Sequence, residues 1–505
     1  MEVLRTKRFI YNSVTFATLQ VFTIAGGLIL TRMFLTTYGS ELNGLVTSII
    51  QFVAYFSYVE AGLGTALIYA LYKPLAKGCI REVDGIVTLA RRSYLKASGV
   101  YFALVVGLSF IYPFIVSSES TDLLTISLLV IVIGAFGALE FFTMAKYRVL
   151  LVADQKEYVI SIVLSIAYIV NFALTAYMIS IEAYVVWVRT VPLVSFILRA
   201  VILLAYVKRN YPYITYKEPA DSKYLKRRWD ALIMQLSVSI NTSVPVVLIS
   251  IFASLKIASV FAIYNLVFSG LIAITSIFTA GVSASFGNIV ANKEMEKLKR
   301  VQTQFEFFIF AITAFLYACA LILIDSFVEL YTQGVTDIDY ASNVYGYLFV
   351  TWGVLFNVRI PYTALINSSG LYRETRRVNI WQIALIISTG AVLVQFWEMT
   401  GVLLAMIISA SYWVYGLIDV VKKEVLDTAP KTTYIRVVRM FAVIAVSILP
   451  FRLGMTIDPS TYAGWVRDAF IVAAWCGIVT LVISFVFDRK VMLEILVRIK
   501  ELIGR

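Results

Sequence analysis

The 505-residue sequence contains no histidine and only three cysteines. Without histidine the chain lacks the commonest general acid or base, the imidazole metal ligand and the histidine proton relay. Any proton whose movement is coupled to transport would therefore have to bind a carboxylate. The cysteines lie far apart and form no CxxC pair, so we expect neither a zinc site nor a disulfide framework. The chain also has no P-loop and no nucleophile elbow, and we expect a protein that is neither an ATPase nor a hydrolase.

Charge is scarce, because only 15% of the residues are charged, whereas 60% are hydrophobic. Soluble domains average about 25% charged residues, so a water-soluble globular protein is excluded. The apolar residues form long runs, such as 14–30, 123–139 and 470–487, each near the ~20 residues that cross a bilayer. The predicted fold class is therefore all-α, a polytopic membrane helix bundle.

The runs predict fourteen transmembrane helices. We place them at residues 12–36, 43–71, 97–117, 123–145, 158–180, 183–207, 231–253, 257–286, 305–325, 343–367, 379–397, 400–421, 438–455 and 468–487.

The net charge of +12, from 43 Lys and Arg against 31 Asp and Glu, supports this placement. Of the 43 basic residues, 35 fall in the connections and termini of one side and only Lys256 and Arg467 in those of the other. By the positive-inside rule, both termini are predicted to be cytoplasmic. The basic excess is thus assigned to membrane orientation, and nucleic acid is not an expected partner.

The same reading divides the chain into five parts. Residues 1–207 form an amino-terminal six-helix lobe, 208–230 a basic cytoplasmic linker and 231–421 a carboxyl-terminal six-helix lobe. Residues 422–487 carry helices 13 and 14, and 488–505 form an amphipathic cytoplasmic tail. Short strings recur between the lobes, for instance EAG at 60–62 and TAG at 279–281, so the lobes are predicted to be pseudo-symmetric parallel repeats.

Several strings resemble Wzx-type polysaccharide and O-antigen flippases, the polysaccharide transporter branch of the multidrug/oligosaccharidyl-lipid/polysaccharide exporter superfamily. They appear in an order and spacing that covers residues 1 to about 420. They are YGSELNG at 38–44, EAGLG at 60–64, LYKPLA at 71–76, AIYNLV at 262–267, SFGN at 285–288, LYTQGV at 330–335 and GLYRET at 370–375.

The resemblance implies a flippase that moves undecaprenyl-pyrophosphate-linked oligosaccharide, a repeat unit of surface or capsular polysaccharide, from the inner to the outer leaflet by alternating access. The implied protein is a secondary transporter and not an enzyme, with no cofactor beyond a coupling proton or sodium ion. Its implied partners are the lipid-linked glycan and membrane lipid, with a polysaccharide polymerase and glycosyltransferases as candidate protein partners. Its implied location is the cytoplasmic membrane of a bacterium or archaeon, which the protein would cross many times.

A diphosphate and sugars cannot cross hydrocarbon without a polar route, so ionisable residues deep in the spans are the candidate site residues. For substrate phosphate or sugar in a cavity, the candidates are Arg32, Arg359, Arg189, Lys256, Asn241, Asn265, Tyr264 and Tyr58. For ion coupling, they are Glu60 and Glu140. Each also has a structural interpretation, such as snorkelling for Arg32, an ion pair for Arg359 and interhelical hydrogen bonds for the asparagines. Glu140 could pair with Arg189, Arg199 or Arg148.

Two other functions stay open. A cation-coupled multidrug exporter of the same superfamily would favour an acidic, aromatic cavity, whereas the deep residues here include four arginines against two glutamates. A membrane glycosyltransferase or polymerase would be expected to carry a large outer loop, and the longest predicted outer connection, 326–342, is short. The sequence therefore favours an anionic substrate.

Overall fold

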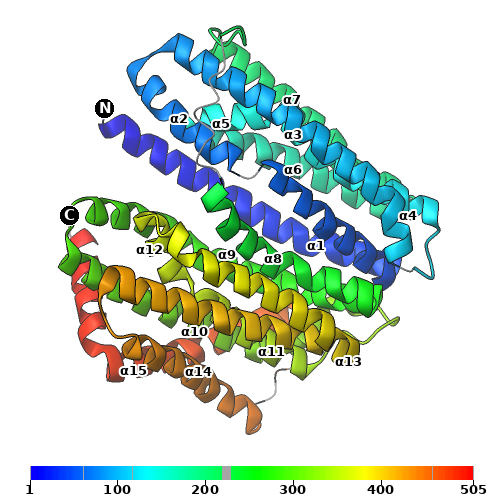
Figure 1. Cartoon of the computed structure of the whole chain (residues 1–505). Helices are drawn as coiled ribbons and strands as arrows, with labels where there is room; N and C mark the ends of the chain where they lie inside the picture. Colours follow the sequence, from blue (N-terminus) through cyan, green and yellow to red (C-terminus); the bar gives the residue numbers. More distant parts are fainter. Residues whose placement is uncertain are drawn as a thin grey trace. The chain divides into compact units, whose positions relative to one another are not determined.

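The computed structural model describes the whole chain except residues 1, 61, 117, 219–228, 456, 458 and 504–505. Every regular element among the described residues is a helix, so the all-helical class is confirmed for that part of the chain (Figure 1). The helices are α1 (Glu2–Phe56), η1 (Ser57–Glu60), α2 (Leu63–Lys77), α3 (Ile80–Ile115), α4 (Leu123–Thr143), α5 (Ala145–Ala153), α6 (Glu157–Ser180), α7 (Val185–Asn210), α8 (Trp229–Phe252), α9 (Leu255–Ala291), α10 (Met295–Tyr331), α11 (Asn343–Val358), α12 (Ile360–Ser369), α13 (Tyr372–Val421), η3 (Lys422–Leu426), α14 (Lys431–Arg452) and α15 (Tyr462–Ile503).

Eleven helices in the described part of the chain are long and apolar enough to cross a membrane, which makes the protein a multi-pass membrane protein. Three of them contain non-helical residues, which are Gly39 in α1, Trp397 and Glu398 in α13, and Asp488 in α15. The breaks in α1 and α13 fall where the sequence predicts a turn between two spans. The Gly39 dihedrals (φ 80°, ψ 175°) lie in a region that only glycine enters readily. The count of fourteen spans stays a prediction.

Several helices reach further than predicted on the side of the basic connections. For example, α3 begins at Ile80 instead of 97 and α10 at Met295 instead of 305, and α5 occupies residues that we expected to form a loop. The hydropathy pattern marks only the lipid-facing part of a helix, whereas the polar extensions are held by buried faces such as Val83, Val87 and Ala90 of α3.

The second span is not one continuous helix, so the predicted helix 43–71 is wrong. α1 ends at Phe56, one 3₁₀ turn follows over Ser57–Glu60, and α2 begins after Gly62. Gly62 has a left-handed conformation (φ 78°), which a side chain would strain. Broken helices inside membrane proteins are tolerated where the backbone is covered by protein or lines a cavity.

The chain forms two compact units. Unit 1 comprises Met1–Ser239 and Ser254–Ser259, and unit 2 comprises Ile240–Ala253 and Val260–Arg505. In unit 1 the closest packing joins α3 to α4, α1 to α6 and α6 to α7. In unit 2, α10 packs against α11, α14 and α15, while α13 packs against α11 and α12.

The two units repeat the same backbone irregularities at a spacing of 215 or 216 residues. Left-handed residues occur in pairs at this spacing, namely Gly78 and Lys293, Gln155 and Gly370, and Glu182 and Glu398. The junction of α4 and α5 at Met144 corresponds in the same way to the junction of α11 and α12 at Arg359. Turns at matching positions indicate that both units have the same order and spacing of helices.

A side-chain feature repeats at the same spacing. Tyr101 of α3 packs its ring against Gly137 of α4, and Tyr317 of α10 packs against Gly353 of α11. A methyl group at either glycine would overlap the tyrosine ring. Small residues let neighbouring helices approach closely in membranes, and each unit uses one to seat a buried aromatic ring.

Candidate functional site

The break in the second span places Glu60 at the centre of the charged cluster of unit 1. Glu60 ends the 3₁₀ turn and is half-buried. Glu60 interacts electrostatically with Arg148 of α5 and Glu140 of α4. The charge of Glu60 also acts on the buried Tyr94 of α3. A carboxylate at this depth is costly unless it serves a pair or a pathway, which makes Glu60 a candidate ion-binding group.

Glu140 has two arginine neighbours. Its carboxylate accepts a hydrogen bond from the Arg199 guanidinium of α7 at 2.9 Å and lies 4.0 Å from Arg148. Arg199 is only 7% exposed, and its Cζ atom lies 4.9 Å from the centre of the Phe196 ring. Among the partners that the sequence left open, the structure therefore selects Arg199 first, and this arginine is neutralised by a neighbouring acid.

A cavity of about 160 Å³ lies beside the paired Arg199, between α4, α6 and α7. Most of its wall is apolar, and its polar groups are Asn171, Ser195, Tyr168 and Arg199. The Ser195 hydroxyl is 3.4 Å from the Asn171 side-chain oxygen. Asn171 and Ser195 were not among the site residues predicted from the sequence.

Arg189, one turn into α7, lies against an aromatic ring instead of a carboxylate. Its Cζ atom is 4.1 Å from the centre of the Phe34 ring of α1, and its charge acts on Tyr38. The Tyr38 hydroxyl donates a hydrogen bond of 2.5 Å to the carbonyl oxygen of Ala183. No described carboxylate lies within 4.0 Å of Arg189, so its charge is available to a ligand.

The other candidates of unit 1 are partly exposed. Arg32 lies on α1, Tyr58 in the 3₁₀ turn before Glu60, and Lys256 at the start of α9. The start of α9 packs closely on α1, because the Asn43 amide donates a hydrogen bond of 2.7 Å to the Ser259 hydroxyl. Lys256 thus belongs to a tightly packed segment.

In unit 2 the main candidate is Arg359, which forms the junction between α11 and α12. Pro361 stands in the first turn of α12, where its missing N–H group costs little. Arg359 is 8% exposed, and its Cζ atom lies 3.9 Å and 4.9 Å from the ring centres of Phe356 and Trp413. No carboxylate among the described residues lies within 4.0 Å of its guanidinium nitrogens.

A polar network lies two residues before Arg359. The Asn357 amide donates hydrogen bonds to the Tyr317 hydroxyl (2.8 Å) and the Gly353 carbonyl (2.9 Å), and its oxygen accepts one from Thr275 (2.6 Å). These hydrogen bonds fix α11 to α9 and α10 directly beside the arginine. Asn357, Tyr317 and Thr275 were not among the site residues predicted from the sequence.

The three remaining candidates of unit 2 are less suited to a ligand. Tyr264 is fully buried, and its hydroxyl is engaged with the backbone of Tyr340 and Ser342 at 3.2 Å to 3.4 Å. Asn241 is also fully buried, and Asn265 is half-buried. Tyr264 therefore stabilises the loop between α10 and α11.

Unit 2 contains a charged cluster that was not predicted from the sequence. Glu306 of α10, 2% exposed, accepts hydrogen bonds from Arg436 of α14 (3.1 Å) and Tyr362 of α12 (2.5 Å). Arg436 also bonds Asp488, which pairs with Arg439. The cluster joins four helices and is internally neutral, as a structural network should be. Among the described residues that were searched, no group of three or more Cys, Asp or Glu side chains could hold a metal ion.

With this geometry the fold is that of polytopic membrane transporters. It is similar to the lipid II flippase MurJ in an inward closed conformation (TM-score 0.66, 13% identity), over 95% of this chain and 100% of that chain. It is also similar to an inward-facing multidrug resistance MATE family transporter of the MOP superfamily (TM-score 0.62, 15% identity), over 79% of this chain and 94% of that one.

A third similar structure is the eukaryotic MATE transporter AtDTX14, with a TM-score of 0.57 and 14% identity over 88% of this chain and 99% of that chain. No family model matches the chain, and no curated protein matches its sequence. Identities this low define the fold alone. The fold expected from the exporter superfamily is confirmed, and the polysaccharide branch stays a prediction.

Proposed function

We propose that the protein is a flippase for undecaprenyl-pyrophosphate-linked oligosaccharide, working by alternating access in the cytoplasmic membrane of a bacterium or archaeon. The observation that carries the proposal is the buried Arg359, which has no carboxylate partner among the described residues and stands at a helix break. A guanidinium that stays charged inside a membrane protein needs an anion, and a diphosphate supplies one.

Arg189 supports the same conclusion from unit 1. Both arginines stack on aromatic rings, which stabilises the cation and holds the planar group in one orientation. Bidentate donors held in this way suit phosphate oxygens better than a cationic drug. The likeness to a structure described as a lipid II flippase, over 95% of this chain, agrees with a lipid-linked substrate.

Ion coupling is part of the proposal. Glu60 stands in a broken helix and has a second carboxylate, Glu140, and an arginine, Arg148, in its electrostatic environment. Such a group can exchange a proton or sodium ion as its surroundings change. We propose that Glu60 binds the coupling ion and that Glu140 sets its electrostatic environment while it is paired with Arg199.

The test is a flipping assay with the purified full-length chain in proteoliposomes. Undecaprenyl-pyrophosphate-linked oligosaccharide carrying a labelled sugar is placed in both leaflets, and its accessibility to an external sugar-modifying reagent is followed. We expect the inner pool to become accessible at least tenfold faster than in liposomes without protein. Equal rates would contradict the proposal.

A cation-coupled multidrug exporter is the second candidate, and the likeness to several MATE transporters favours it. The two functions are separated in cells that lack the protein. A flippase defect leaves lipid-linked oligosaccharide in the inner leaflet and reduces surface glycan. Hypersensitivity to cationic drugs with normal surface glycan would instead identify the exporter.

A further inference from the structure

The segment that follows α7 is tied firmly to α3 of unit 1. Asp84 of α3 is 2% exposed and accepts hydrogen bonds from the Thr215 N–H (3.0 Å), the Thr215 hydroxyl (2.7 Å) and the Tyr216 N–H (2.9 Å). These bonds hold Tyr216 in a left-handed conformation (φ 60°) that a tyrosine rarely adopts. The position of the Tyr216 ring is therefore fixed by a buried carboxylate.

Tyr216 and Tyr147 form an aromatic corner with a cation on each ring. Their hydroxyl groups lie 3.4 Å apart. The Arg91 Cζ atom of α3 is 4.9 Å from the centre of the Tyr216 ring, and the Lys146 Nζ atom of α5 is 5.0 Å from the centre of the Tyr147 ring. We call Arg91, Lys146, Tyr147 and Tyr216 the basic corner.

The two cations of the basic corner form no ion pair with a carboxylate of the described residues. Neither Arg91 nor Lys146 lies within 4.0 Å of a described carboxylate, and both oxygens of the nearby Asp84 carboxylate already accept hydrogen bonds from the linker. Burial lowers the pKa of Lys146, and the positive charge of Arg91 lowers it further. Arg91 is exposed and Lys146 is half-buried, and their like charges disfavour each other, so an anion between them would stabilise both.

From helix lengths we infer that the basic corner stands where lipid headgroups would lie. Arg91 is 24 residues from the far end of α3 at Ile115, about 36 Å along a helix at ~1.5 Å per residue. α4 runs from Leu123 to Thr143, about 30 Å by the same measure, and Lys146 follows it after the junction at Met144. The two lengths match or slightly exceed the ~30 Å hydrocarbon core.

We propose that the basic corner binds the phosphate or diphosphate group of a membrane lipid at the cytoplasmic face of unit 1. This rests on the proposed function to the extent that the lipid-linked substrate would load here before transport. Arg91 and Lys146 supply the charge, and the two tyrosine hydroxyls supply hydrogen bonds to phosphate oxygens. Asp84 is a positioning residue, because it acts only by holding Tyr216.

The first experiment measures binding of inorganic pyrophosphate to the detergent-purified full chain by calorimetry. In the double variant Arg91→Gln/Lys146→Gln we expect at least tenfold weaker binding than in the unaltered protein. The variant Arg92→Gln is the matched control, because Arg92 is an exposed arginine on the same helix and outside the corner. Equal binding in the double variant, or an equal loss in the control, would overturn the proposal.

A charge-preserving variant tests whether lost binding results from misfolding. Arg91→Lys/Lys146→Arg keeps both charges, and we expect it to retain pyrophosphate binding within about threefold. If this variant and the double glutamine variant fold equally well but both lose binding, charge does not hold the anion and the proposal fails.

The source of the anion is identified in nanodiscs that contain either undecaprenyl pyrophosphate or phosphatidylglycerol. Preferred retention of the diphosphate lipid by the unaltered protein, lost in the double glutamine variant, would support substrate loading. Equal retention of both lipids would support a site for anionic headgroups in general. Pyrophosphate binding without any flipping in the proteoliposome assay would contradict the proposed function and leave the anion site standing.

Discussion

Arg359 is the single residue on which the proposed substrate depends most. Burying a charge without a counter-charge costs free energy that an apolar side chain of similar length does not cost. We therefore expect Arg359→Met to fold with an unchanged or higher midpoint of thermal unfolding, and to lose at least 90% of flipping. Arg359→Lys keeps the charge but loses the planar stacking, and we expect an intermediate rate.

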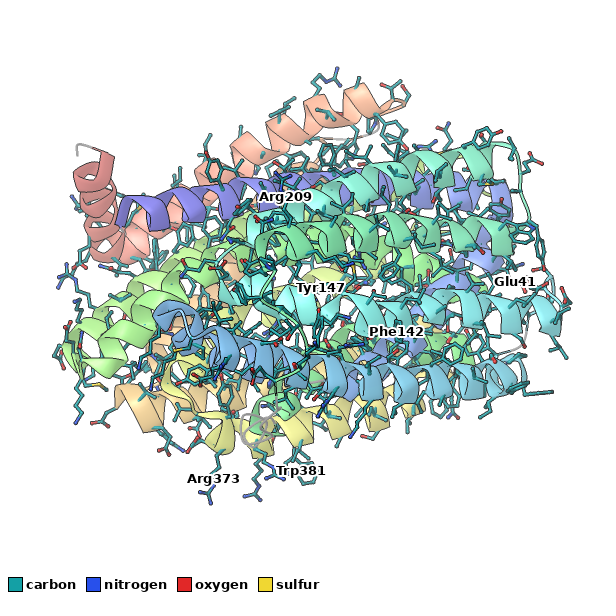
Figure 2. All side chains as sticks on the ribbon, turned by 90° about the horizontal axis from the view of Figure 1, so that it is seen from above. Glu41, Phe142, Tyr147, Arg209, Arg373 and Trp381 are labelled. Atoms are coloured by element: carbon teal, nitrogen blue, oxygen red, sulfur yellow. The ribbon has the colours of Figure 1, made fainter. Side chains whose placement is uncertain are left out.

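Arg373→Met is the control for this prediction, because Arg373 is an exposed arginine of the same unit (Figure 2). We expect it to retain normal flipping. A large drop in thermal stability for Arg359→Met with normal flipping per folded molecule would show that Arg359 only anchors α11 to Trp413.

Glu140 and Arg199 are expected to stabilise unit 1 as a pair. Removing one partner leaves the other poorly compensated, so Glu140→Gln and Arg199→Gln should each lower the free energy of unfolding by about 2 kcal/mol. In the double variant the loss should be smaller than the sum of the two, since the interaction is removed only once. A double-mutant cycle of unfolding in detergent measures this coupling.

Arg148 provides the comparison within the same cluster. Its side chain is 65% exposed and 4.0 Å from Glu140, so Arg148→Gln should change the free energy of unfolding by less than about 0.5 kcal/mol. Fully additive effects of Glu140→Gln and Arg199→Gln would contradict the assignment of a coupled pair.

The sequence located these residues along their helices but left their partners open. Spacing gives the depth of Glu140 and Arg199 in their spans, because each residue adds a fixed rise. It does not give the rotation of α4 relative to α7, which decides whether Glu140 meets Arg199 or Arg189. For the same reason Tyr264, placed by the sequence among ligand-binding residues, is directed at the backbone of the α10–α11 loop.

At the scale of the helix, neither a proline nor a glycine alone predicts a break. Pro361 stands in the first turn of α12, where the missing N–H group costs little. Other prolines lie inside continuous helices, namely Pro74, Pro113, Pro192, Pro245 and Pro450. Gly62 did not announce the break after Glu60, because glycine is also common inside membrane helices. The break depends on the neighbours of Gly62 and not on its own preference.

The packing of Tyr101 on Gly137 makes a testable prediction for α3 and α4. A methyl group at Gly137 would overlap the Tyr101 ring, which is 2% exposed and has no room to move. Gly137→Ala should therefore lower the free energy of unfolding by about 1–3 kcal/mol, the usual cost of overpacking. Thermal unfolding of the purified variant measures the change.

Gly107 of α3 is the matched control, because a Cβ atom there meets no other atom within 4 Å. Gly107→Ala should leave stability unchanged or raise it by up to about 1 kcal/mol, since alanine favours helix more than glycine. If both variants behave alike, close packing at Gly137 is not what holds the two helices together.

For the whole molecule, composition predicted a membrane-spanning helix bundle, and the structure has the fold of membrane transporters. The orientation stays a prediction and can be tested with a native residue. Cys79 is exposed at the start of α3, whereas Cys319 is half-buried and Cys476 is buried. A membrane-impermeant maleimide should therefore label the chain in inside-out vesicles and leave it unlabelled in right-side-out vesicles.

Cys79→Ser should abolish this labelling and so confirm which thiol reacts. Strong labelling of the unaltered chain in right-side-out vesicles would reverse the predicted orientation. It would also move the basic corner to the opposite leaflet, since Arg91 lies on α3, which begins directly after Cys79.

Unit 1 is built from two separate segments of the chain, and this has a consequence for its biosynthesis. Residues Ser254–Ser259 pack with a unit whose main segment ends at Ser239, and the Asn43 amide bonds Ser259. A nascent chain released into the bilayer helix by helix cannot complete its first half until the ribosome has passed codon 259. Truncated chains that stop at residue 239 should accordingly remain bound to insertion chaperones longer than chains that stop at residue 291.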